Sequence, residues 1–81
     1  MRLKRNIAVS ESGFIFNPAT GDSFSANPVG LRILELLKEG KGDSEIISTL
    51  TSEFNVEDHR MKQDLEDFLS MLQQLYLIED G

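Results

Sequence analysis

The stretch that decides the fold is "GDSFSANPVG", residues 21–30, because strand periodicity changes to helical periodicity within it. Ser23 to Ala26 alternate polar and apolar side chains, which is typical of a short half-buried strand. Asn27 is a residue type that caps helix N-termini, and Pro28 suits the first helical position. The stretch therefore predicts a short strand at the end of a small sheet, followed at once by a helix.

Two further strands are predicted upstream. Ile7 and Val9 alternate with small or polar residues, and Phe14 to Phe16 form a run of aromatic and β-branched side chains. Clusters of Gly, Pro, Asn and Ser separate these runs, as turns do. Connections this short favour an antiparallel meander in chain order, which leaves the third strand, Ser23 to Ala26, at an edge of the sheet.

Three helices are predicted downstream. The first begins at Asn27 and ends near Gly40, and the second runs from Ser44 to Glu53 with Asp43 as its cap. The third helix is the longest, and its apolar stripe consists of Met61, Leu65, Phe68, Leu72 and Leu75, widened by Leu69 and Tyr76. We expect Phe68 to be buried and the pair Leu77-Ile78, after this helix, to return to the core. The order βββααα predicts one α+β domain over residues 1–81.

The composition narrows the class of protein. The chain has 81 residues, enough for one small core, and no cysteine, so disulfides and thiolate metal sites are excluded. Its net charge of −6 disfavours binding to a phosphate backbone. No stretch approaches the roughly 18 apolar residues of a membrane-spanning helix. We expect a cytoplasmic protein with neither nucleic acid nor a membrane as partner.

The sequence gives little support to an enzyme. His59 is the only histidine and lies among acidic residues near a predicted helix start, where an exposed position is the simpler interpretation. There is no second histidine for a metal site and no Gly-rich phosphate loop. Asp64 and Asp67 are explained by a solvated helix face. We therefore expect no catalytic residue, no metal ligand and no cofactor.

A DNA-binding regulator is the alternative from a different class. The second and third predicted helices could form a helix-turn-helix, as in winged-helix transcriptional regulators. A recognition helix should present basic and amide side chains, and the third helix offers Arg60, Lys62 and Gln63. However, five acids lie between Glu57 and Asp67. The shape allows duplex DNA, and the charge argues against it.

The free strand edge suggests a third kind of function. Only its shortness and the flanking Asp22 and Pro28 protect the edge of Ser23 to Ala26. Met61 lies near the start of the third helix, where it could line the rim of an apolar groove or belong to the core. An open edge next to an apolar groove is one way to bind a peptide as an added strand.

With these elements laid out, the chain resembles the PqqD family, whose fold is also called the RiPP recognition element. The resemblance runs from about Leu3 to Ile78 and rests on the order and spacing of several markers. These markers are the helix entry Asn27-Pro28, Ile33-Leu34 with Gly40, Ile46 with Leu50, and Asp64 followed by Phe68, Leu72 and Leu77.

The resemblance implies a winged-helix-like domain without catalytic activity. Such a domain binds the leader region of a ribosomally synthesised precursor peptide and presents it to a modifying enzyme, often a radical SAM maturase. The leader adds as a strand to the third strand and packs against the third helix. The implied peptide-binding residues are Asp22, Ser23, Phe24, Ser25 and Ala26 on the strand, and Met61, Lys62, Leu65 and Leu69 on the helix.

One departure concerns the pathway. Members from pyrroloquinoline-quinone synthesis usually carry a Trp and a Leu-rich Pro-Glu stretch near the second strand. Here that region reads Phe14-Ile15-Phe16-Asn17-Pro18, and the chain has no Trp. The resemblance therefore puts quinone synthesis in doubt and leaves other modified-peptide pathways equally open.

Overall fold

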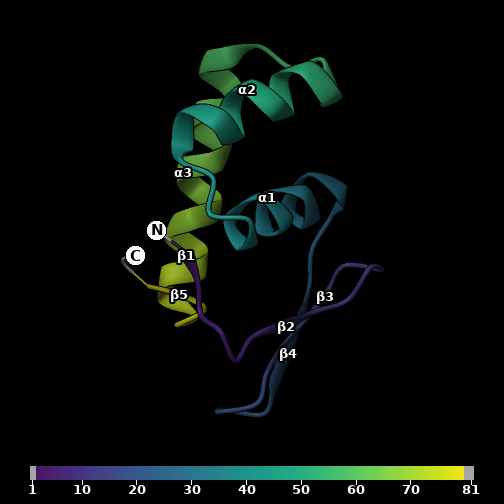
Figure 1. Ribbon diagram of the computed structural model, residues 1–81, viewed down its shortest axis with the longest axis vertical. Helices are drawn as coiled ribbons and strands as arrows, with labels where there is room; N and C mark the ends of the chain where they lie inside the picture. Colours follow the sequence, from purple (N-terminus) through teal and green to yellow (C-terminus); the bar gives the residue numbers. More distant parts are fainter. Residues whose placement is uncertain (1, 80–81) are drawn as a thin grey trace.

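The computed structural model describes residues 2–79, which form two small sheets and three helices (Figure 1). The elements in chain order are β1 (Arg2–Leu3), β2 (Ala8–Val9), β3 (Phe14–Asn17), β4 (Asp22–Ser25), α1 (Pro28–Lys38), α2 (Asp43–Phe54), α3 (Asp58–Gln74) and β5 (Ile78–Glu79). The predicted α+β class, a three-stranded antiparallel sheet followed by three helices, is confirmed.

The three-stranded sheet has the order β2-β3-β4, and both pairs are antiparallel. Val9 lies opposite Ile15, and Ile15 lies opposite Phe24, so these three side chains share the face that packs against the helices. Phe14 and Phe16 point to the other face. Within residues 2–79, β4 has a partner on one side only, as the meander predicted.

Gly13 allows β4 to approach the turn that precedes β3. Its φ is +93°, and a Cβ built at this position would lie 2.7 Å from the Ala26 carbonyl oxygen. The Ala26 N–H donates a hydrogen bond to the Gly13 carbonyl over 2.8 Å, so the pairing extends one residue beyond β4. Only glycine combines this backbone conformation with this contact.

Both ends of α1 follow from its sequence. The Asn27 side chain accepts a hydrogen bond from the Gly30 N–H at 2.7 Å, and Pro28 is the first helical residue, as predicted. At the other end Gly40 has φ +82°, and the Lys41 N–H donates to the Leu36 carbonyl at 3.0 Å. This arrangement satisfies the carbonyl groups that a helix end leaves open.

The start of α2 differs from the prediction. Asp43 is the first helical residue and not the cap, because Gly42 takes the extended cap conformation with φ −82° and ψ 170°. Among the side chains that the structure describes, none caps this end by a hydrogen bond. The carboxylates of Asp43 and Glu45 lie in the first turn, where they interact favourably with the helix dipole. A side-chain contact links α1 to the last turn of α2. Arg32 of α1 donates two 3.0 Å hydrogen bonds to the Glu53 carboxylate, and these bonds raise the pKa of Arg32.

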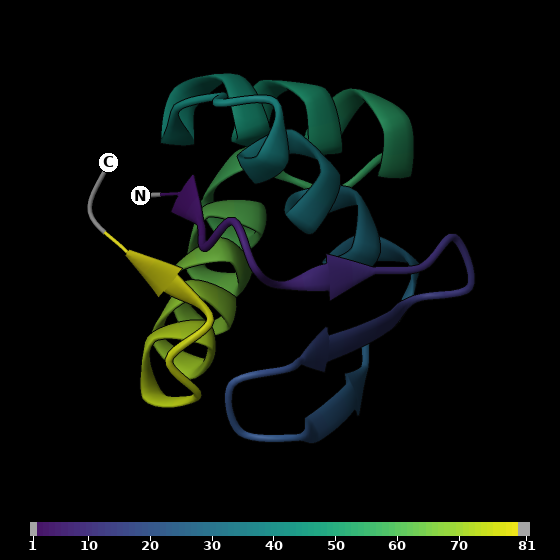
Figure 2. The same cartoon turned by 60° about the horizontal axis from the view of Figure 1, so that its bottom comes forward.

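The pairing of β1 with β5 was not predicted. Arg2 lies opposite Glu79 and Leu3 opposite Ile78, and the Lys4 N–H donates to the Leu77 carbonyl at 3.0 Å. Figure 2 shows these two strands side by side, in purple and yellow. Strands of two residues carry no periodicity in the sequence. The predicted return of Leu77-Ile78 to the core is confirmed, since both side chains are buried.

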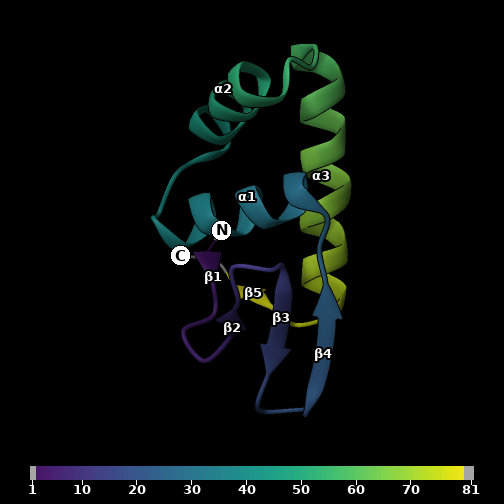
Figure 3. The ribbon, with the colours of Figure 1, turned by 90° about the vertical axis from the view of Figure 1, so that its right-hand side faces the viewer.

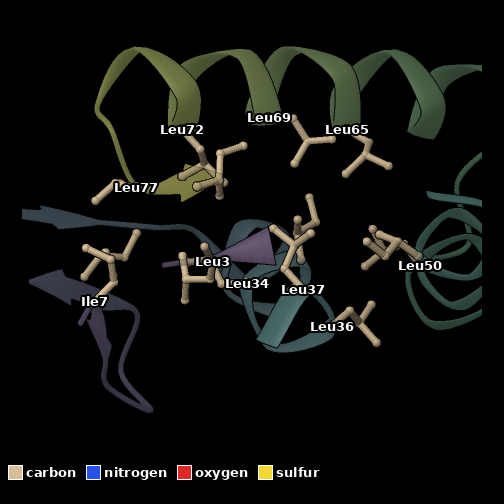
Figure 4. Packing of buried hydrophobic residues seen from close by; sticks show 14 of the residues in the cluster. Leu3, Ile7, Leu34, Leu36, Leu37, Leu50, Leu65, Leu69, Leu72 and Leu77 are labelled. Carbon is tan, nitrogen blue, oxygen red and sulfur yellow. The ribbon is translucent and has the colours of Figure 1, made fainter. Parts of the chain in front are cut away.

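The core lies between α3, α1, α2 and the inner face of the sheet, with α3 along one side of it (Figure 4). The buried apolar residues are Leu3, Ile7, Ile15, Ile33, Leu34, Leu36, Leu37, Ile46, Leu50, Met61, Leu65, Leu69, Leu72, Leu77 and Ile78. The expectation that Phe68 is buried is wrong. Its ring is only half-buried and packs on Gly30, where an added Cβ would meet the ring at 3.0 Å.

Leu65→Ala is expected to lower the free energy of unfolding by about 2–5 kcal/mol, because it empties space in a closed part of the core. Glu66→Ala is the matched control on the same turn of α3. Its side chain is exposed, so a change within about 0.5 kcal/mol is expected. Urea denaturation measures the free energy of unfolding of both variants. A loss below about 1 kcal/mol for Leu65→Ala would contradict the packing of α3.

Candidate functional site

The free edge of β4 presents backbone groups from two serines. The Ala26 N–H donates a hydrogen bond to the carbonyl of Gly13, which directly precedes β3. Successive N–H groups along a strand point to opposite sides. Phe24, which lies opposite Ile15, therefore directs its N–H and carbonyl toward β3. Ser23 and Ser25 direct theirs to the free edge. These two residues are where another strand can bond.

β4 and the C-terminal half of α3 are neighbours in the fold (Figure 3). An apolar cleft lies between them. Its volume is about 180 Å³. The strand side is formed by Phe24, Ser25 and Ala26, the helix side by Phe68, Met71, Leu72 and Leu75, and the floor by Ile15 and Leu77. None of these nine lining residues is charged. The cleft therefore suits apolar side chains that lie next to the serine edge.

The structure brings the predicted strand residues 23–26 to this site. Asp22 lies opposite Asn17 at the start of β4 and does not line the cleft, and the predicted helix residues lie elsewhere. Met61, Leu65 and Leu69 are buried in the core. Met61 is only 1% exposed, so of the two positions that the sequence leaves open for it, groove rim and core, the structure shows the core. The reason is α2, which folds back over the N-terminal half of α3 (Figure 1). Asn55 makes this reversal possible, because it takes the left-handed conformation with φ +54° at the end of α2.

Lys62 lies away from β4. It lines a separate hollow of about 460 Å³ between α2 and α3, together with the exposed His59 and Asp58. This hollow belongs to the surface that a helix-turn-helix interpretation would use, and its lining residues include one acid, Asp58, beside Lys62. The geometry gives no support to Lys62 as a neighbour of the strand edge.

The helix residues that line the cleft are Phe68, Met71, Leu72 and Leu75. Three of them, Phe68, Leu72 and Leu75, belong to the apolar stripe that the sequence predicts, whereas Met71 lies outside that stripe. The short connection at residues 55–57 indicates which half of α3 faces the sheet. Because this connection is short, α2 must cover the first half of α3, and only the second half remains to contact the sheet.

The chemistry of the site is that of peptide binding. Serine backbone groups can extend the sheet, and the cleft can accept alternate side chains of the added strand. Within residues 2–79, no group of three or more His, Cys, Asp or Glu side chains lies close enough together to hold a metal ion. None of the helices in this range is long and apolar enough to cross a membrane.

Comparisons with known proteins agree with this geometry. The family model described as "Coenzyme PQQ synthesis protein D (PqqD)" matches residues 13–78. The solved structure of TbiB1 in complex with the TbiA(beta) leader peptide is 31% identical, with a TM-score of 0.89 over 100% of this chain and 98% of that chain. A lasso peptide synthetase B1 complexed with the leader peptide is 22% identical, with a TM-score of 0.85 over 98% and 96%. No curated protein matches the chain.

The direction of the backbone groups can be tested by amide hydrogen exchange. The Phe24 and Ala26 amide protons bond to β3 and its turn, whereas that of Ser25 points to solvent. We expect Ser25 to exchange about tenfold or more faster than either neighbour in the unbound protein. NMR spectra recorded after transfer to D₂O measure these rates. Slow exchange at Ser25 together with fast exchange at Phe24 would reverse the assignment.

Proposed function

The chain belongs to the PqqD family, and we propose that it binds the leader region of a ribosomally synthesised precursor peptide and presents it to a modifying enzyme. The leader adds to β4 as a further strand and places apolar side chains in the cleft. One observation carries this proposal. The outward backbone groups of Ser23 and Ser25 lie beside an uncharged cleft formed by α3.

Strand addition divides the binding between two kinds of contact. Backbone hydrogen bonds are largely independent of the peptide sequence, and side-chain pockets provide the selectivity. Within the chain, the β4 edge supplies the first and the cleft supplies the second. Side chains that face the cleft come from every other peptide residue, because side chains alternate along a strand.

The similarity to TbiB1 supports the class of ligand. That protein is 31% identical over the whole chain and is seen with a leader peptide. The lasso peptide synthetase B1 is 22% identical and supports the fold alone. The second proposed partner is a modifying enzyme, and a radical SAM maturase is one class that receives peptides from such domains. In this proposal the domain itself has no catalytic activity.

Ser25→Pro tests the strand edge. Proline removes the Ser25 N–H, which points outward, so the domain should remain folded while an added strand loses a hydrogen bond. We expect binding to weaken about tenfold or more. The probe is a fluorescein-labelled peptide selected on the protein from a display library of random dodecapeptides, and anisotropy measures its dissociation constant.

Ser25→Ala is the control, because alanine keeps the N–H and removes only the hydroxyl. It should bind the selected peptide as tightly as the wild type. Circular dichroism and thermal melting show whether Ser25→Pro is folded. A folded proline variant with wild-type affinity would show that the peptide does not add to β4.

Met71→Asp tests the helix side of the cleft. Met71 lines the cleft and is exposed, so the substitution should spare the fold. A carboxylate at this position must be desolvated by an apolar peptide side chain, and we expect affinity for the selected peptide to fall about tenfold. Gln73→Asp adds the same charge to α3 outside the cleft and should have little effect. Equal losses in the two variants would indicate a charge effect and not a contact.

A further inference from the structure

The outer face of the three-stranded sheet carries two exposed aromatic rings. Phe14 is 59% exposed and Phe16 is 44% exposed, and both point away from the core. Phe14 lies opposite Ser25, and Phe16 lies opposite Ser23. The two rings therefore stand one strand in from the free edge, separated from it only by short serine side chains.

The serines link this face to the edge where we propose strand addition. In a sheet, residues opposite one another on neighbouring strands point to the same face, whichever direction the strands run. Peptide residues opposite Ser23 and Ser25 must therefore project over the outer face. Two rows result, one from Phe16 over Ser23 to the peptide and one from Phe14 over Ser25 to the peptide.

The spacing of these rows favours large peptide side chains. Two strand separations are about 9.6 Å, so a small peptide side chain cannot reach the rings, whereas a long or aromatic one can lean across the serine. On the other side of Phe16, the opposite residue is Ala8, whose side chain is as short as those of the serines. The outward-facing paired residues Ala8, Phe14, Phe16, Ser23 and Ser25 include no charge, which matches an apolar occupant.

We propose that Phe14 and Phe16 form a second subsite for the same peptide, on the outer face of the sheet. This subsite takes large apolar side chains at two peptide positions that are two residues apart. The inference rests on the proposed strand addition at β4. It implies that the ligand is apolar at successive positions, one set facing the cleft and the other set facing Phe14 and Phe16.

The continuity of this face with the peptide edge is the reason for choosing the peptide as its occupant. Once a strand is bonded to Ser23 and Ser25, its outward side chains stand beside these serines, and large ones reach the two rings without any further binding event. A second copy of the chain or the modifying enzyme would need additional contacts to reach the same surface.

A thermodynamic cycle tests the subsite. The protein variant is the double substitution Phe14→Thr and Phe16→Thr, in which threonine keeps a strand-forming side chain. The ligands are the selected dodecapeptide and a series in which each large apolar residue is replaced in turn by threonine. Anisotropy titrations measure the dissociation constant of each peptide with the wild type and with the double variant. The four constants of each cycle give the coupling free energy between that peptide position and the two rings.

We expect the double variant to bind the selected peptide about three- to tenfold more weakly than the wild type. At two peptide positions separated by one residue, replacement by threonine should weaken binding to the wild type but not to the double variant. Tyr76→Asn is the control. It removes an aromatic ring that is 71% exposed outside the sheet, from a position with φ +58° that asparagine tolerates.

The outcomes separate this inference from the function on which it rests. Unchanged affinity in the double variant, with affinity lost in Ser25→Pro, would overturn the subsite and leave strand addition intact. Such a result would assign the rings to another occupant, such as a second copy or the enzyme. Unchanged affinity in a folded Ser25→Pro variant would overturn strand addition and the subsite together.

Discussion

The hydrogen bond from the Ala26 N–H to the Gly13 carbonyl is the constraint on which the site depends. It sets the alternation of backbone groups along β4 and so determines that the two serines, and not Phe24, face outward. It exists only because Gly13 lets the chains approach, since any Cβ there would collide with the Ala26 carbonyl. A substitution at Gly13 would therefore disturb the peptide edge from outside the site.

A second constraint divides α3 into two halves. The short connection after α2 makes α2 cover the first half, where Met61 and Leu65 join the core. The second half extends beyond α2 and lies along β4, where Phe68 and Met71 remain partly open. One continuous apolar stripe thus serves two purposes, and the position of α2 decides which residues serve each.

The sequence was sufficient for the order of the helices and the meander, because Asn27-Pro28, Gly40 and the change of period are local signals. It was insufficient for β1 and β5, whose pairing joins the two ends of the chain through two-residue strands. The strand half of the site was predictable, since β4 is the last strand of the meander. The helix half was not predictable, because an apolar stripe does not reveal which neighbour covers each turn, and Met61 lies in the core.

The shortness of β4 limits what its backbone can contribute to binding. Ser23 and Ser25 each offer one N–H and one carbonyl, and a hydrogen bond contributes a net ~0.5–1.5 kcal/mol. Fixing the backbone of each peptide residue costs about 1–2 kcal/mol, so the backbone bonds roughly offset the ordering of the few residues that make them. Net affinity must therefore come from side chains. An edge this short favours a ligand whose side chains are bound on more than one face, and it discourages unselective pairing with other strands.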